Sequence, residues 1–406
     1  MMHRVGEVPF AQAGGQPPAA GPLAATPSSR LAGAATLVPL AILAAMAPLL
    51  LGWISVAPNR LVSPRVAALP QSTVVLAAAA LFHLSCLVLL LAAWRPRPSW
   101  LAEAAAVAGV LALAATLGLG TAAALPAAST LARAAPAAGA WIALLLLALA
   151  MAASAVIRGG TPALPLLGAL LGLAVLGHAG LFDSLSLARE ASGRAGDLRG
   201  AVLGHLALSV SSLLLALVLA VPLSAIAFAH PRLERAFLAA ASGIQVIPSI
   251  ALFGMLIAPL AALATAFPAL RDLGLGGVGP APAVIGIGAY LVLPLARGIL
   301  SGLRVAPDDL VEAARGQGLS SRGILLGLRV PLGAGVMLGA LRLATVQAVG
   351  LATLAALVGG GGLGTLVFQG IGQLATDLIL LGVLPVLALS LAADAGLALL
   401  SRLVPA

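Results

Sequence analysis

The sequence EAARGQG at residues 312–318, followed by LRVP at 328–331, is a short polar island in a chain that is otherwise almost wholly apolar. The island carries the arginines Arg304, Arg315, Arg322 and Arg329. Pro307 and the two aspartates after it predict a helix start, because proline suits the first turn and acidic residues favour the positive end of the helix dipole. The two glycines of the stretch are expected to end that helix, and Ser320 to cap a second one. The island therefore predicts a pair of short helices that meet a cytoplasmic partner.

The rest of the chain has the composition of a membrane protein. It is 61% hydrophobic and only 8% charged. Helices surrounded by lipid explain this composition better than the core of a soluble protein does. Apolar runs of roughly 20 residues, each able to cross about 30 Å of hydrocarbon, predict an all-α polytopic membrane protein with about ten transmembrane helices. The first run is expected at 31–57, and another span, which contains Pro248, is expected at about 236–262.

The order of the runs divides the chain. Residues 1–30 have the composition of a disordered cytoplasmic tail. Residues 31–182 are an accessory membrane block of about five helices, and the more polar residues 183–202 are an extracytoplasmic linker. Residues 203–406 form the last domain, with about five spans and a coupling loop at 304–331.

Arginine placement favours one orientation. With the island in the cytoplasm, about a dozen arginines lie inside and about seven outside, as the positive-inside rule expects. The net charge of +9 is then spread over loops, so no nucleic acid partner is predicted, and lipid surrounds the spans. The expected location is the bacterial cytoplasmic (inner) membrane.

Several chemistries are excluded by the residue types present. The sequence has no lysine, which a Walker A loop needs to reach nucleotide phosphates. Cys86 is the single cysteine, so disulfides and cysteine metal sites are excluded. The sequence shows no cluster of acidic residues and histidines of the kind that would indicate catalytic residues or a metal site. An ion-coupled secondary transporter is the alternative function, with only Asp394 and Asp377 as candidate carboxylates.

The island resembles the EAA loop of ABC importer permeases, in which EAA is followed by a glycine and later by a proline. In that family the loop is a coupling helix that docks into a groove on the ATPase subunit. The resemblance implies an ATPase-coupling loop made of Glu312, Ala313, Ala314, Gly318 and Pro331. Glu312 is expected to hold the turn by hydrogen bonds. ATP and Mg then belong to separate ATPase subunits, and this chain needs no cofactor.

Three stretches of the second half resemble permeases for quaternary-ammonium osmoprotectants such as glycine betaine, choline and carnitine. They are QVIPSIAL at 245–252, PAVI at 282–285 leading to Tyr290, and ATLAAL at 352–357. The plan of five spans with the EAA loop after the third is similar to the methionine-importer-like membrane domain, a type I ABC importer permease core. The resemblance implies the permease subunit of a binding-protein-dependent ABC importer. Its partners would be ABC ATPase subunits, an extracytoplasmic solute-binding protein and a second permease copy or paralogue.

Polar residues near a proline are a candidate translocation path. Pro248 frees a backbone carbonyl within its span, and Gln245, Ser249 and Tyr290 could offer weak contacts beside it. The alternative is a kinked helix whose polar groups satisfy one another. Aromatic residues make up only 3% of the chain, too few for a cage around a cation. Affinity is therefore expected to reside in the binding protein.

Arg342 is the one arginine deep within a predicted span. A charge at that depth usually pairs or lines a wet cavity, and Asp394 on the last span is the expected partner in an intramembrane ion pair. The alternative is that Arg342 snorkels to the cytoplasmic interface.

Overall fold

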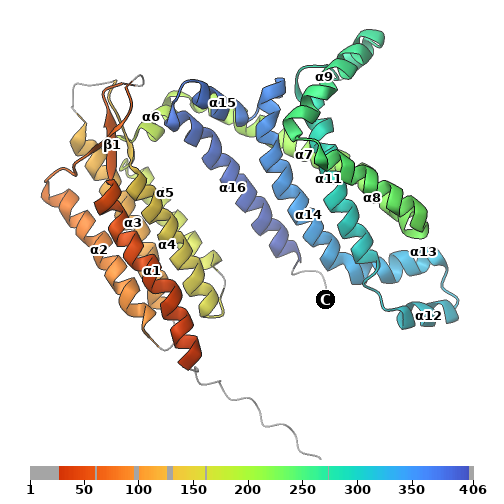
Figure 1. Ribbon diagram of the computed structural model, residues 1–406, viewed down its shortest axis with the longest axis horizontal. Coiled ribbons are helices and arrows are strands. Elements are labelled where there is room, and N and C mark those ends of the chain that lie inside the picture. Colours follow the sequence, from red (N-terminus) through yellow and green to blue (C-terminus); the bar gives the residue numbers. More distant parts are fainter. Residues whose placement is uncertain are drawn as a thin grey trace, which may run out of the picture. The chain divides into compact units, whose positions relative to one another are not determined.

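The structure, a computed structural model, describes residues 27–59, 62–95, 100–125, 131–160, 162–272 and 274–401. The chain divides into two compact units between Phe182 and Asp183, and helices dominate both (Figure 1). The tail predicted for residues 1–30 lies outside the described residues as far as residue 26. From Pro27 the chain is already helical.

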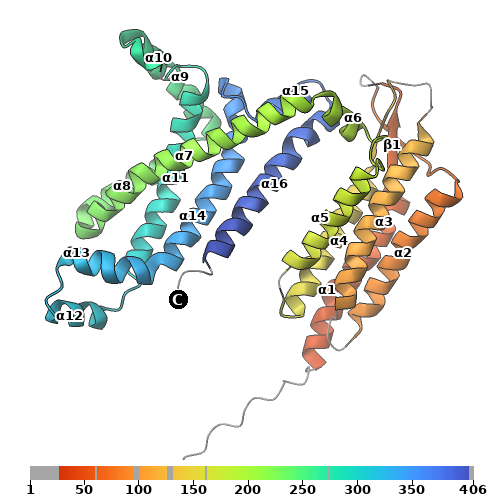
Figure 2. The ribbon, with the colours of Figure 1, turned by 180° about the vertical axis from the view of Figure 1, so that it is seen from behind.

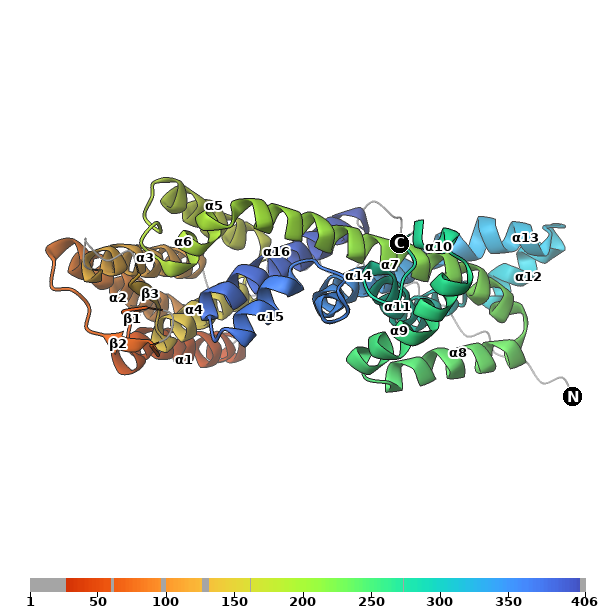
Figure 3. The same cartoon turned by 90° about the horizontal axis from the view of Figure 1, so that it is seen from above.

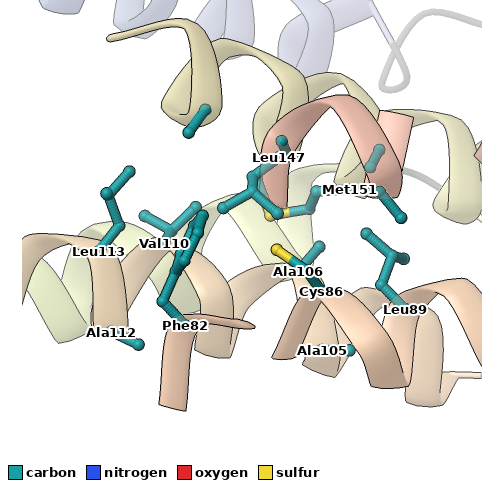
Figure 4. Packing of buried hydrophobic residues seen from close by; sticks show 14 of the residues in the cluster. Phe82, Cys86, Leu89, Ala105, Ala106, Val110, Ala112, Leu113, Leu147 and Met151 are labelled. Atoms are coloured by element: carbon teal, nitrogen blue, oxygen red, sulfur yellow. The ribbon is translucent and has the colours of Figure 1, made fainter. Parts of the chain in front are cut away.

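The first unit is a bundle of apolar helices. They are α1 (Pro27–Leu51), α2 (Thr73–Ala93), α3 (Trp100–Ala124), α4 (Ala138–Ile157) and α5 (Ala163–His178). Side chains of α2, α3 and α4 converge on one core that includes Phe82, Val110 and Leu147 (Figure 4). Many of the other core positions are alanine, and such small side chains let helices approach closely within a membrane.

An ion pair joins two helix ends of this unit. Glu103 near the start of α3 is buried, and it accepts hydrogen bonds from Arg158 Nε at 2.5 Å and from Arg158 Nη2 at 2.9 Å. Arg158 follows the last residue of α4. The carboxylate is therefore held inside the protein, because its charge is paired there.

A small antiparallel sheet lies beside the helices, and the all-helical prediction did not include it. Strands β1 (Ile54–Ala57), β2 (Arg65–Ala67) and β3 (Arg133–Pro136) pair in the order β2-β1-β3. The span predicted at 31–57 is wrong at its end, because α1 stops at Leu51 and Gly52 has a left-handed φ of 84°. Pairing satisfies the backbone groups of these connections.

The second unit contains the remaining elements. They are α6 (Ser186–Gly193), α7 (Ala195–Ala229), α8 (Pro231–Val246), α9 (Ser249–Ala266), α10 (Ala269–Asp272), α11 (Pro280–Leu303), α12 (Asp308–Gly316), α13 (Ser321–Ile324), the π-helix η1 (Leu325–Arg329), α14 (Val330–Ala352), the 3₁₀-helix η2 (Thr353–Val358), α15 (Gly364–Gly372) and α16 (Thr376–Ser401). Helix α11 packs against α7, α8, α9 and α14 (Figure 3). Its buried side chains Ile287, Leu291 and Leu295 form the centre of the core.

Glycines allow α11 and α14 to cross at close range. A Cβ atom at Gly333 would lie 2.1 Å from the carbonyl oxygen of Gly302, and one at Gly298 would lie 2.0 Å from Ala340 Cβ. No side chain fits at such a distance, so these positions require glycine.

The substitution Gly333→Ala is therefore expected to destabilise the unit, by roughly 1–3 kcal/mol for an overpacked contact. Gly335→Ala is the matched control on the same helix, because a Cβ there meets nothing within 4 Å, and alanine favours the helix by up to about 1 kcal/mol. Thermal unfolding in detergent should show a lower Tm for the first variant only. Equal Tm values would contradict this crossing.

The predicted all-α polytopic fold is confirmed. Among the described residues, eight helical runs are long and apolar enough to cross a membrane, and two shorter apolar helices cover Ala35–Leu51 and Ala163–His178. Ten runs match the predicted number of about ten spans, although the bounds of several differ from the prediction. Helix α1 as a whole starts earlier, at Pro27.

The prediction of one span at 236–262 is wrong. The chain breaks between Val246 and Ser249, so α8 and α9 are separate helices. Pro248 has no N–H and disfavours a helical conformation in the residue before it. Accordingly, Ile247 is extended, with ψ at 126°.

The segment predicted as a linker, 183–202, is largely helical. It holds α6 and the first turns of α7. Ser186 Oγ donates a 3.0 Å hydrogen bond to Asp377 Oδ1, and both residues are buried. This contact ties α6 to the first turn of α16. The polar composition of the segment suggested a loop, although it marks an amphipathic helix.

Candidate functional site

The polar island folds into α12 and α13 at the end of the second unit opposite to α15 (Figure 2). As predicted, α12 ends at the two glycines, and Gly318, which follows its last turn, takes a left-handed φ of 83°. Its N–H donates to the Arg315 carbonyl at 2.9 Å, and the N–H of Leu319 donates to the Ala314 carbonyl at 3.1 Å. These two bonds form a Schellman motif, which normally requires glycine at the left-handed residue.

The second helix of the island begins as expected. Ser320 Oγ accepts a 3.2 Å hydrogen bond from the N–H of Gly323, which caps α13. The chain then passes through η1 into α14, whose second residue is Pro331. Because Pro331 has no N–H and clashes with the carbonyl of the preceding turn, a widened π-turn relieves the strain there.

A core of its own holds the island together. Ala306, Val311 and Ile324 are buried, and Ala314 and Leu328 pack against them. Glu312, Ala313 and Leu310 are exposed. Helix α12 thus turns one face inward to α13 and leaves Glu312 and Ala313 of the EAA sequence on its surface.

The role expected of Glu312 within the turn is wrong. In the described part of the chain, its carboxylate makes no hydrogen bond or ion pair, and its side chain is exposed. The turn is held by Ser320 and by the backbone bonds at Gly318. The carboxylate is therefore available to another molecule.

Two of the four island arginines anchor it to the spans. Arg304 Nη2 donates to Glu234 Oε2 of α8 at 2.5 Å. Arg329 Nη1 donates to the Leu303 carbonyl at the end of α11 at 2.7 Å, and its guanidinium lies 5.2 Å from the centre of the Phe228 ring. These contacts tie the two ends of the island to α7, α8 and α11.

The candidate translocation path has a different geometry from the one the sequence suggested. Tyr290 Oη donates a hydrogen bond to the carbonyl of Ile247, which the break before Pro248 leaves outside any helix. Gln245 Nε2 donates at 2.9 Å to the Tyr290 carbonyl, whose normal helical partner would be the missing N–H of Pro294. The two side chains therefore donate to two backbone carbonyls that have no helical partner, those of Ile247 and Tyr290. These two hydrogen bonds link the break between α8 and α9 to α11.

Of the remaining path candidates, Pro248 is exposed and Ser249 is half-buried. Gln245 and Tyr290 fit the alternative of a kinked helix whose polar groups pair. Their place beside a passage is a proposal only.

Removing one of these hydrogen bonds is expected to weaken the link between the α8–α9 break and α11. The substitution Tyr290→Phe leaves the Ile247 carbonyl without its donor, and hydrogen bonds between membrane helices are worth about 0.6 kcal/mol and at most about 1.7. Thermal unfolding in detergent should show a small fall in Tm. Gln245→Leu should give a similar fall, since it frees the Tyr290 carbonyl. A Tyr290→Phe variant as stable as the parent would argue against the bond.

The structure brings Arg342 and Asp394 together across α14 and α16. Arg342 Nε donates to Asp394 Oδ1, and Nη2 donates to Oδ2 at 2.5 Å. The pair is bidentate, the strongest arrangement of these two groups. The side chains remain 43% and 36% exposed.

A buried histidine that the sequence analysis did not single out lies near the opposite end of α14. His205 of α7 is fully buried, and its Nε2 lies 2.9 Å from the Val349 carbonyl. There α14 changes into η2, and the pattern of backbone hydrogen bonds changes from α to 3₁₀. A carbonyl at this point is stabilised by a hydrogen bond from a side chain of another helix. The only sequence signal was a histidine inside an apolar run. The loop 359–362, with left-handed residues at Gly359, Gly361 and Gly362, packs beside it.

Comparisons with known proteins agree with this geometry. Residues 212–404 match the family described as binding-protein-dependent transport system inner membrane component. The carnitine transport permease OpuCB of Listeria monocytogenes is 31% identical over 202 residues, which cover 50% of this chain and 85% of that protein. This chain belongs to the permeases of binding-protein-dependent ABC importers. It is thus a multi-pass protein of the inner membrane and a transport component.

Further matches cover both parts of the permease. The osmoprotectant import permease OsmW of Salmonella typhimurium is 34% identical, over 49% of this permease and 88% of that protein. Residues 30–188 match the N-terminal domain of the ABC transporter permease YehY. An inward-facing structure of the MetNI methionine ABC transporter is 20% identical over 53% of this chain and 99% of that chain, with a TM-score of 0.47.

Proposed function

We propose that this permease imports quaternary-ammonium osmoprotectants, of the class that includes glycine betaine, choline and carnitine. The names of its relatives support this class: a carnitine permease, an osmoprotectant permease and a choline transport permease from Bacillus subtilis, which is 30% identical over 88% of its length. The stretches at 245–252 and 352–357 resemble the same branch.

The energy would come from separate ATPase subunits that bind ATP and Mg. The observation that carries this proposal is the exposed EAA face of α12, which rests on its own small core. When the two ATPases close, α12 would move with them. Arg304 and Arg329 would pass that movement to the spans through Glu234 and the end of α11.

Solute affinity would reside in an extracytoplasmic binding protein. Cation recognition by aromatic faces needs several rings around the charge, and the chain has one tyrosine, whose hydroxyl is bonded to the Ile247 carbonyl. Contacts in the passage are then weak, which allows release. Because one core supplies half a pore, a second copy or a paralogue would complete it.

Uptake of radiolabelled glycine betaine and choline into proteoliposomes tests the function. The permease is reconstituted with its binding protein, with and without the candidate ATPase. We expect uptake only when the ATPase and ATP are present. Uptake that needs an ion gradient and no ATPase would refute the proposal, as would a fully assembled importer that moves neither solute.

A further inference from the structure

The ion pair of Arg342 and Asp394 lies within two helices that are long and apolar enough to cross a membrane, and both side chains remain partly exposed. At 1.5 Å per residue, Arg342 is about 18 Å from the start of α14, and Asp394 is about 10 Å from the end of α16. The side chains are 43% and 36% exposed. Charged groups at such depth do not face lipid; they face a water-filled cavity or another polar surface. The exposed side of the pair is therefore expected to face such a cavity or surface.

The ion pair has hydrogen-bond donors and acceptors that remain free to bind a solute. Nε and Nη2 of Arg342 are both used by Asp394. The third nitrogen, Nη1, has no hydrogen-bond acceptor among the described residues, although it carries two N–H donors. Each oxygen of Asp394 accepts one bond from Arg342, which leaves it a further lone pair.

There is room beside the pair on α14. Gly335 and Gly339 precede Arg342 by seven and three residues and therefore share its side of the helix. Both are exposed, and a Cβ at either position would meet nothing within 4 Å. In the part of the chain that the structure describes, the helix surface at these two glycines is therefore open.

We propose that Arg342 and Asp394 form a transient contact site for a small zwitterion, one that carries a carboxylate and a permanently cationic nitrogen. This inference rests on the proposed function. The carboxylate would meet Arg342 Nη1, and the cationic nitrogen would lie beside Asp394, so that the two dipoles are antiparallel. A plain cation gains only the second contact and is repelled by the arginine. Since the charges of Arg342 and Asp394 already neutralise each other, the site binds the zwitterion weakly.

The test is a variant that keeps the packing but removes both charges, Arg342→Met with Asp394→Leu. Replacing an ion pair by apolar residues of similar volume usually preserves folding. ATP-driven uptake of glycine betaine, a zwitterion, is compared with that of choline, a cation, in the reconstituted importer. We expect the ratio of kcat/KM for glycine betaine over choline to fall by roughly tenfold, the loss of one charge-assisted contact.

The control is the same exchange at the other ion pair, Arg158→Met with Glu103→Leu, which should leave the ratio unchanged. The same binding protein serves every variant, so its own preference cancels. An unchanged ratio, an equal loss for both solutes, or a selective loss of choline uptake would overturn the site. A parent importer that transports neither solute would instead refute the proposed function itself, and the site with it.

Discussion

The substitution Gly318→Asp is expected to abolish ATP-driven transport while the protein inserts normally. Gly318 has a left-handed φ of 83°, which costs most L-residues roughly 1–2 kcal/mol and costs aspartate and asparagine less. A carboxylate would also project from the exposed end of α12, where the ATPase is proposed to dock. If the added charge weakens ATPase docking by about 1.4 kcal/mol or more, the affinity falls at least tenfold, so uptake into proteoliposomes should fall below about a tenth of the parent value.

Two variants separate these causes. Gly318→Asn has nearly the same shape without the charge and tolerates the left-handed conformation, so it should lose less transport. Gly316→Ala is the control on the same helix; it lies in an ordinary helical conformation with open space around it and should transport like the parent. Normal solute-stimulated ATP hydrolysis in the Gly318→Asp protein would count against the coupling role.

The second large effect is expected from Arg342→Ala. This change leaves Asp394 unpaired within the membrane, where an isolated charge is expensive. The yield of monodisperse protein in detergent should fall by roughly tenfold, because an unpaired acid at that depth weakens insertion and packing.

Removing the partner as well should restore the yield, so Arg342→Ala combined with Asp394→Ala is the rescue variant. Rescue identifies the two side chains as one interacting pair, because independent sites give additive effects. Additive losses in the double variant would show that the charges act separately. The rescue concerns folding alone and leaves open the selectivity tested above.

The sequence predicted the island well, because each of its features has a local cause. The two glycines, Ser320 and the proline at 331 act on the backbone within a few residues. The end of α12, the cap on α13 and the start of α14 followed from them. The Arg342–Asp394 contact was also expected, since charges within a membrane have few partners to choose from.

Features that depend on distant residues could not be predicted. The three-stranded sheet joins segments around residues 55, 66 and 135, and no local pattern announces such pairing. The two hydrogen bonds at Tyr290 form only because the fold brings the break at Ile247 next to the turn of α11 that lacks the N–H of Pro294. Glu312 was assigned to the turn from its position alone, whereas its side chain points to the surface.

The central claim is that α12 faces the cytoplasm and is moved by an ATPase on another chain. A single cysteine introduced by Glu312→Cys tests it directly, because the natural Cys86 is buried in the first unit. An impermeant maleimide should label this cysteine in inside-out vesicles and not in intact cells, and bound ATPase should protect it. Labelling from outside intact cells, or equal labelling with and without the ATPase, would contradict the claim.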